Sequence, residues 1–172
     1  MKRIFILFII SLVAKSSGAQ IAKNTVYLEL LGNGGLYSIN FDRILVDAEK
    51  FKISSSIGYG SYPNENIEGI PFEVNFLFGH KHYFELGTGI SYIKGLTQVE
   101  PDHSYGVISS TIYNTYRIGY RYQKDVKGFF FKVAVIPFVR VYEYEEFFKS
   151  DPDKAFFLSL GAAVGYSFNL RK

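Results

Sequence analysis

The sequence predicts an all-β protein, an eight-stranded antiparallel up-and-down transmembrane β-barrel, from three observations. First, apolar residues alternate with small or polar ones over many long stretches. Second, the connections between these stretches alternate between short and long. Third, 18% of the residues are aromatic, with 16 Gly and no Cys. After the N-terminal region no apolar run has the length that a membrane-spanning helix needs, so strands are the remaining way to cross a bilayer.

The clearest alternation lies in residues 156–170, with the sequence FFLSLGAAVGYSFNL. Every second residue from Phe156 to Leu170 is apolar or aromatic, and after Phe157 the residues between them are small or polar. Successive side chains of a strand point to opposite faces, so one face is apolar and the other small and polar. A tilted strand crosses a bilayer with about 9–11 residues, so this stretch is long enough to be the closing strand of the barrel.

The N-terminus has the three-part layout of a secretory signal peptide. Lys2 and Arg3 precede an apolar run that ends at Ala14, and a small, polar stretch follows. We expect a signal peptide of residues 1–19 and an outer-membrane barrel domain of residues 20–172. The mature chain then carries 16 basic and 16 acidic residues because the leader holds three of the 19 Lys and Arg. This balance gives no indication of nucleic-acid binding.

Eight strands are expected in order along the mature chain. Their approximate ranges are 25–31, 36–44, 51–59, 70–78, 82–93, 107–122, 129–142 and 156–170. Pro137 falls inside the seventh strand, where it removes a ladder hydrogen bond, so we expect a bulge or kink there.

The connections between the expected strands also form a pattern. The second, fourth and sixth are short, whereas loops 60–69, 94–106 and 143–155 are long, and Gly32–Gly35 forms a tight first turn. Bacterial outer-membrane barrels have short periplasmic turns and longer outer loops. The pattern therefore predicts long loops outside and both termini in the periplasm.

Alternation alone does not decide which face points inward. In a soluble barrel the second face would meet water and carry many charges, but here it is mostly Gly, Ser, Thr and Asn. We therefore expect this face to fill the lumen, with its charges paired as a network. The nine charged residues assigned to the lumen are Glu29, Asp42, Lys52, Glu73, Glu85, Arg117, Arg121, Lys132 and Arg140. The apolar face carries almost no charge and is expected to meet lipid.

These features resemble the small eight-stranded outer-membrane barrels of the OmpA/OmpX type, over the whole mature chain but at the level of architecture. The C-terminal sequence GYSFNL is similar to the signal that the barrel assembly machinery reads, with Gly165, Phe168 and Leu170 at its defining positions and two basic residues after it. Residues 32–40 look like the first hairpin of uncharacterised bacterial outer-membrane β-barrel proteins. The resemblance implies a porin-like monomer among outer-membrane lipid and lipopolysaccharide, and it implies no activity.

Three groups of residues suggest chemistry, but a structural interpretation is preferred for each. Asp102-His103-Ser104 holds the residue types of a hydrolytic triad, yet three consecutive side chains do not readily converge. His80 and His82 offer two metal ligands, whereas a stable zinc site needs three or four. The acidic loop 143–155 offers carboxylates for a calcium ion, but it lacks the ligand spacing of an EF-hand. We therefore expect no catalytic residue, no metal site and no cofactor.

The preferred function is a non-enzymatic integral outer-membrane protein whose outward loops serve surface contact or envelope integrity. One alternative is a lipid A-modifying enzyme, either a deacylase or an acyltransferase. Another is a narrow small-solute channel, although eight strands leave little free bore. A third is a soluble periplasmic lipocalin-like barrel, in which the apolar face would line an internal cavity.

Overall fold

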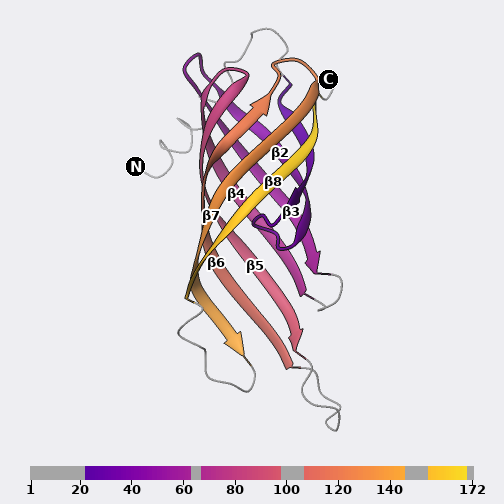
Figure 1. The fold of residues 1–172 in the computed structure, drawn as a ribbon, viewed down its shortest axis with the longest axis vertical. Helices are drawn as coiled ribbons and strands as arrows, with labels where there is room; N and C mark the ends of the chain where they lie inside the picture. The colour runs from indigo at the N-terminus through magenta and orange to yellow at the C-terminus, as the bar shows by residue number, and fades with distance from the viewer. Residues whose placement is uncertain (1–21, 63–66, 98–106, 146–154, 170–172) are drawn as a thin grey trace, which may run out of the picture.

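The computed structural model describes residues 22–62, 67–97, 107–145 and 155–169, which form one closed antiparallel β-barrel (Figure 1). Each strand pairs with its neighbours in sequence, and β8 pairs with β1. The strands are β1 (Asn24–Leu30), β2 (Tyr37–Asp47), β3 (Phe51–Tyr62), β4 (Ile67–Gly79), β5 (His82–Thr97), β6 (Val107–Gln123), β7 (Gly128–Glu145) and β8 (Phe156–Phe168). The described residues include no helix long and apolar enough to span a membrane. The predicted all-β, eight-stranded closed barrel is confirmed.

The strands are strongly tilted because the register is staggered around the barrel. Following the paired residues from Val26 on β1 through every strand in turn leads to Phe156 on β8, whereas Val26 itself pairs with Tyr166. The stagger is therefore ten residues, from position 156 to position 166. With about 3.3 Å per residue and about 4.8 Å between strands, this corresponds to a tilt of roughly 40°.

The two ends of the barrel differ in the way the strands are joined. The connections from β2 to β3, from β4 to β5 and from β6 to β7 are short and lie at the top of Figure 1. At the other end β5, β6 and β7 reach furthest, whereas β1 has only 7 residues. The predicted signal peptide 1–19 and most of the three long loops lie outside the described residues.

The apolar side of each strand faces outward. On β8 the side chain of Leu160 is 65% exposed, whereas Ala163, on the opposite face, is 2% exposed. Strand β4 follows the same pattern, with Phe72 and Phe76 exposed and Glu73 and Asn75 buried. The inner face is therefore the polar one, as the distribution of small residues predicts.

The inner face also contains apolar residues, and β7 contributes more of them than any other strand. Phe130 packs on Tyr27 of β1, with ring centroids 5.2 Å apart. Further along β7, Ile136 and Phe138 are buried and Tyr113 of β6 packs against them. The Tyr27–Phe130 contact lies against the charged side chains Lys132 and Arg121, whereas the cluster of Ile136, Phe138 and Tyr113 lies further along β7.

The expected bulge at Pro137 is wrong. Pro137 pairs regularly with Leu158 of β8, and the register between β6 and β7 is the same on both sides of it. The ladder to β6 is only interrupted there, because proline has no N–H to donate. The register shift between these strands lies instead at Ile112/Tyr113, with a second one between β2 and β3 at Ile44/Val46.

A charged residue of β2 lies on the apolar outer face. Arg43 on β2 is exposed and follows the outward-pointing Ile39 and Phe41 in the alternation. Its register partners are Asn24 on β1, which is buried, and Ser55 on β3, so the neighbours of Arg43 across the ladder are polar.

The first connection, Gly32–Gly35, is not a simple exposed turn but folds into the barrel. All four of its residues are buried. Gly34 packs so tightly on β3 and β4 that a Cβ atom on Gly60 or Gly69 would meet the Gly34 carbonyl oxygen at 2.1 or 2.5 Å. These two glycines therefore make room for the inward turn.

Candidate functional site: the charged network of the lumen

The middle of the lumen holds seven charged side chains that are almost fully buried. They come from six strands and are Glu29, Asp42, Glu73, Glu85, Arg117, Arg121 and Lys132. All seven are among the residues assigned to the lumen by alternation. Charges this deeply buried must be paired and hydrogen-bonded, because the loss of hydration costs several kcal/mol for each ion.

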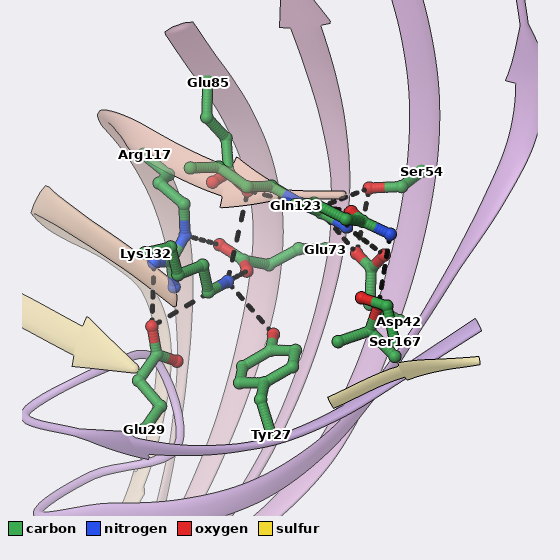
Figure 2. Close-up of polar contacts among 12 residues, drawn as sticks. Tyr27, Glu29, Asp42, Ser54, Glu73, Glu85, Arg117, Gln123, Lys132 and Ser167 are labelled. Carbon is green, nitrogen blue, oxygen red and sulfur yellow. Dashed lines mark hydrogen bonds and ion pairs between the residues drawn. The ribbon is translucent and has the colours of Figure 1, made fainter. Parts of the chain in front are cut away.

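Arg117 on β6 joins two carboxylates at the centre of the network (Figure 2). Its Nη1 donates to Oε1 of Glu29 on β1 at 2.8 Å, and its Nε donates to Oε1 of Glu73 on β4 at 3.0 Å. A guanidinium group presents several donors in a fixed plane, so one arginine can hold both acids. Arg117 therefore ties together strands that are far apart around the barrel.

Arg121 lies four residues further along β6, on the same face as Arg117, and makes a second cluster. Its Nη2 donates to Oδ1 of Asp42 at 2.6 Å, and its Nη1 donates to Oδ2 of the same carboxylate at 3.2 Å. Gln123 accepts from Nε of Arg121 at 2.9 Å and donates to the carbonyl oxygen of Ala22 at 3.1 Å. This chain of hydrogen bonds closes the end of the lumen that carries the short turns.

Lys132 on β7 lies between the two arginine clusters. Its Nζ donates to the hydroxyl of Tyr27 at 3.0 Å and lies 3.9 Å from Glu29, 4.0 Å from Glu73 and 4.0 Å from Glu85. It also lies 4.4 Å from the centroid of the Tyr27 ring, in cation–π geometry. One ammonium group thus balances the carboxylates that the arginines do not fully satisfy.

Glu85 on β5 is the least satisfied member of the network. Its nearest cations are Arg121 at 3.9 Å and Lys132 at 4.0 Å, and neither of its carboxylate oxygens has a hydrogen-bond partner. Asn75 on β4 is also fully buried with an unpartnered side chain. The centre holds four carboxylates and three cations, so Glu85 is its surplus negative charge.

Asn33, in the inward-folded first connection, completes the network and was missed by sequence reasoning. Its Nδ2 donates to Oε1 of Glu73 and, at 3.1 Å, to Oγ1 of Thr115, while its Oδ1 accepts from Nη2 of Arg117 at 3.3 Å. The sequence signal at this point, Asn followed by Gly-Gly, is the usual signature of an exposed hairpin turn. No property of that signature indicates that the turn points inward.

Two residues assigned to the lumen lie away from this network. Lys52, at the short-turn end, forms its own ion pair with Asp47, with Nζ 2.6 Å from Oδ1. Arg140 is half-buried near the far end of β7, where its backbone N–H donates to the carbonyl oxygen of Ala155. Lys52 is the second residue of β3 and Arg140 lies in the last third of β7, so the two lie toward opposite ends of the barrel.

The other candidate groups are placed as follows. His82 contacts Tyr120, with Nδ1 2.6 Å from the hydroxyl oxygen, and its ring packs on Tyr122, whereas His80 is exposed in the turn. Within the described ranges no group of three or more His, Cys, Asp or Glu residues could hold a metal ion. Asp102-His103-Ser104 and positions 146–154 of the acidic loop lie outside those ranges.

The residues of the C-terminal signal lie on the strand that closes the barrel. Gly165 pairs with Tyr27 and Phe168 pairs with Asn24, both on β1, whereas Leu170 lies outside the described residues. Gly165 is packed against β1 so closely that a Cβ atom would meet the carbonyl oxygen of Val26 at 2.3 Å.

Comparisons of this chain with known protein families, with curated proteins and with solved structures found no match. What the site can do chemically is therefore inferred from the positions and burial of its own side chains. Arg117 and Arg121 are 1% and 0% exposed, so solvent does not reach past them through an open bore. The network is suited to hold strands together, and its described members include no serine, cysteine or threonine beside a histidine that could act as a nucleophile.

Proposed function

We propose that the chain is an integral, non-enzymatic protein of the bacterial outer membrane, of the OmpA/OmpX type. The observation that carries the proposal is the inverted polarity of the barrel. Its charges are buried in the lumen, and its large apolar side chains cover the outside. In water this arrangement exposes a continuous apolar surface, whereas in a bilayer every face meets a matching environment.

The dimensions of the apolar surface support this proposal. On β4 the outward residues from Ile70 to Phe78 are apolar, and the next outward residue is Glu68, which pairs with Lys94 of β5. Nine residues tilted by roughly 40° cover about 20 Å, close to the apolar band of about 25 Å in outer-membrane barrels. The Glu68–Lys94 pair would then mark the outer border of the band.

An aromatic row at the other border supports the same placement. Phe51, Phe78, Phe84 and Tyr120 follow one another as register partners across β3, β4, β5 and β6. All four are exposed on the outer face. Outer-membrane barrels carry such aromatic girdles where the hydrocarbon meets the head groups.

Arg43 is compatible with a bilayer because of its position and length. It lies one outward step from Leu45, near the end of β2 that leads into a short turn. A long basic side chain near the interface can reach the head groups while its stem stays in hydrocarbon. At such a depth an arginine costs about 0–1 kcal/mol, much less than at the midplane.

The filled lumen bears on the alternative functions. A small-solute channel needs an open path, but buried ion pairs cross the lumen at two levels. A lipocalin-like barrel needs an apolar interior, but here the interior is charged in its middle. We therefore propose that the protein acts through its outward loops, in surface contact or envelope integrity, with the barrel as a closed anchor that the assembly machinery inserts.

Gel mobility of the protein from a washed outer-membrane fraction, boiled and unboiled, tests the proposal. A folded barrel that resists detergent migrates differently from the boiled chain, so we expect a mobility shift in this fraction. Recovery of the protein in the soluble periplasmic fraction, without a shift, would overturn the membrane assignment. Unchanged lipid A mass spectra in a His103→Ala/Ser104→Ala variant are expected for a non-enzymatic barrel.

A further inference from the structure

The wall of the barrel has a step where β8 meets β1. The last residue pair between these strands is Leu30 with Ala162, whereas β8 begins at Phe156. Residues 156–161 therefore pair only with β7 among the described strands. We call this feature the β8 step and define it as residues 156–161 together with Leu31.

The chain leaves the β1 ladder at Leu31 in a strained conformation. Leu31 has a φ angle of 54°, which is uncommon for a residue with a branched side chain and costs of order 1 kcal/mol or more. The carbonyl oxygen of Leu31 accepts a hydrogen bond from Oγ of Ser159 at 2.6 Å, which fixes the bend beside β8. This hydrogen bond holds Leu31 beside Ser159, and the chain then turns into the lumen instead of pairing with residues 156–158 of β8.

An aromatic stack lies on the inner face beside the step. Phe138 and Phe157 are stacked with centroids 4.4 Å apart, and Tyr113 packs edge-on against both at 5.7 and 5.5 Å. Phe138 is 2% exposed, but Phe157, which belongs to the step itself, is 40% exposed. One face of the stack is therefore open on the side where β1 has ended.

The outer apolar surface runs up to the same edge. Leu31, Leu158 and Leu160 are each at least half exposed around the step. If the barrel lies in a membrane as proposed above, hydrocarbon covers these side chains and lies next to Phe157 with no strand of β1 in between. Leu31 and Gly32 of the first connection lie against Ser159 and Gly161, so the part of the β8 edge that stays open among the described residues is 156–158. Hydrocarbon leaves the backbone polar groups of this edge unsatisfied, whereas a polar head group can satisfy them.

We propose that the β8 step is a lateral lipid-binding site, in which the hydrocarbon chain of a membrane lipid packs on Phe157 and the head group lies at the edge of β8. This inference rests on the proposed membrane location. An amphiphile fits because the site pairs an open aromatic ring with a free strand edge. The strained Leu31 is explained by this role, since an uninterrupted β1 would cover the ring.

The absence of tryptophan from the chain makes a direct test available, because one introduced Trp is the sole tryptophan fluorophore. We would reconstitute Phe157→Trp and Leu158→Trp separately into phosphatidylcholine vesicles with brominated acyl chains, which quench Trp on contact. The two positions are adjacent in sequence but point to opposite faces, so Leu158→Trp is the matched lipid-exposed control. Phe130→Trp, in the closed lumen, is the shielded control.

We expect Phe157→Trp to lose fluorescence to an extent comparable with Leu158→Trp, while Phe130→Trp stays bright. Strong quenching of Leu158→Trp with none of Phe157→Trp would overturn the lateral site while leaving the membrane location intact. Quenching of Phe157→Trp by acrylamide but not by brominated lipid would also overturn it, because water would then cover the ring. Quenching of neither variant would contradict the membrane location itself.

A second reporter guards against a folding defect at position 157. Tyr113→Trp places the probe on the edge of the same stack, from β6 rather than β8. Each variant is first checked for the heat-dependent mobility shift of the parent. If Phe157→Trp does not fold, brominated lipid is expected to quench Tyr113→Trp more than Phe130→Trp, and equal brightness of these two variants would overturn the proposal.

Discussion

Arg117 on β6 and Glu29 on β1 lie 2.8 Å apart in the lumen, although 88 residues separate them in the chain. Both side chains are nearly inaccessible to solvent. The pair therefore joins distant parts of the closed barrel in a low-dielectric setting, where an unmatched charge is costly.

Replacement of Arg117 with an apolar residue is expected to destabilise the barrel strongly. Arg117→Met leaves the carboxylates of Glu29 and Glu73 without their main partner, and breaking a buried pair in this way costs about 3–5 kcal/mol. Urea unfolding of the refolded protein, followed by the mobility shift, measures the loss. The matched control is Arg43→Met on the outer face, where a change below about 1 kcal/mol is expected. Equal losses in the two variants would contradict the assigned positions.

The surplus charge of the network predicts that two glutamates differ in their response to neutralisation. Glu29→Gln removes a charged acceptor from Arg117 and is expected to cost about 1–3 kcal/mol. Glu85→Gln removes a carboxylate that makes no hydrogen bond, so stability is expected to stay unchanged or to rise. Urea midpoints of the two variants, measured side by side, test this. A larger loss for Glu85→Gln than for Glu29→Gln would contradict the assignment of Glu85 as the surplus charge.

Asn33 is expected to contribute to stability in spite of lying in a connection. Asn33→Ala removes partners of Glu73, Thr115 and Arg117 together, and leaving buried polar groups unsatisfied costs about 1–3 kcal/mol. The control is Asn114→Ala, because Asn114 is on β6 but only half-buried. A thermal or urea unfolding series that finds Asn33→Ala as mild as the control would place the first connection outside the lumen.

Aspartate substitutions on β8 test the direction of its two faces. Leu160→Asp puts a charge on the exposed apolar face and is expected to abolish insertion into vesicles, and Val164→Asp likewise. Ser159→Asp and Ser167→Asp put the same charge on the inner face and are expected to be tolerated better. The measurement is the fraction of protein that shows the mobility shift after refolding into lipid. Similar fractions for both pairs would contradict the facing.

Gly165 is expected to resist even the smallest side chain. A Cβ atom in Gly165→Ala would approach the carbonyl oxygen of Val26 and the Cβ of Tyr27 to within 2.5 Å or less, so the β1–β8 seam must shift. Overpacking of this kind costs about 1–3 kcal/mol. Gly95→Ala is the matched control on β5, because its nearest contact is Cγ1 of Ile67 at 3.2 Å. Slower refolding and lower stability are expected for Gly165→Ala alone.

The sequence by itself determined the fold class and the two faces of each strand. The face on which a residue such as Leu160 or Glu73 lies follows from the alternation of apolar and polar residues along its strand. Local covalent geometry imposes this alternation of side chains on any strand. The same alternation assigned the charges of the central network to one face. The count of strands and the order of short and long connections follow from where the alternation stops.

The tertiary structure alone decided which residues meet across the lumen. Arg117 on β6 meets Glu29 on β1 across the lumen because the closed barrel staggers its strands by ten residues, and stagger is a property of the closed sheet that no single strand encodes. The inward turn that carries Asn33 depends on the space that Gly60 and Gly69 leave on other strands. The bulge expected at Pro137 lies elsewhere, since a ladder can lose one hydrogen bond without changing register. Local periodicity thus sets the faces, whereas contacts between distant strands set the partners.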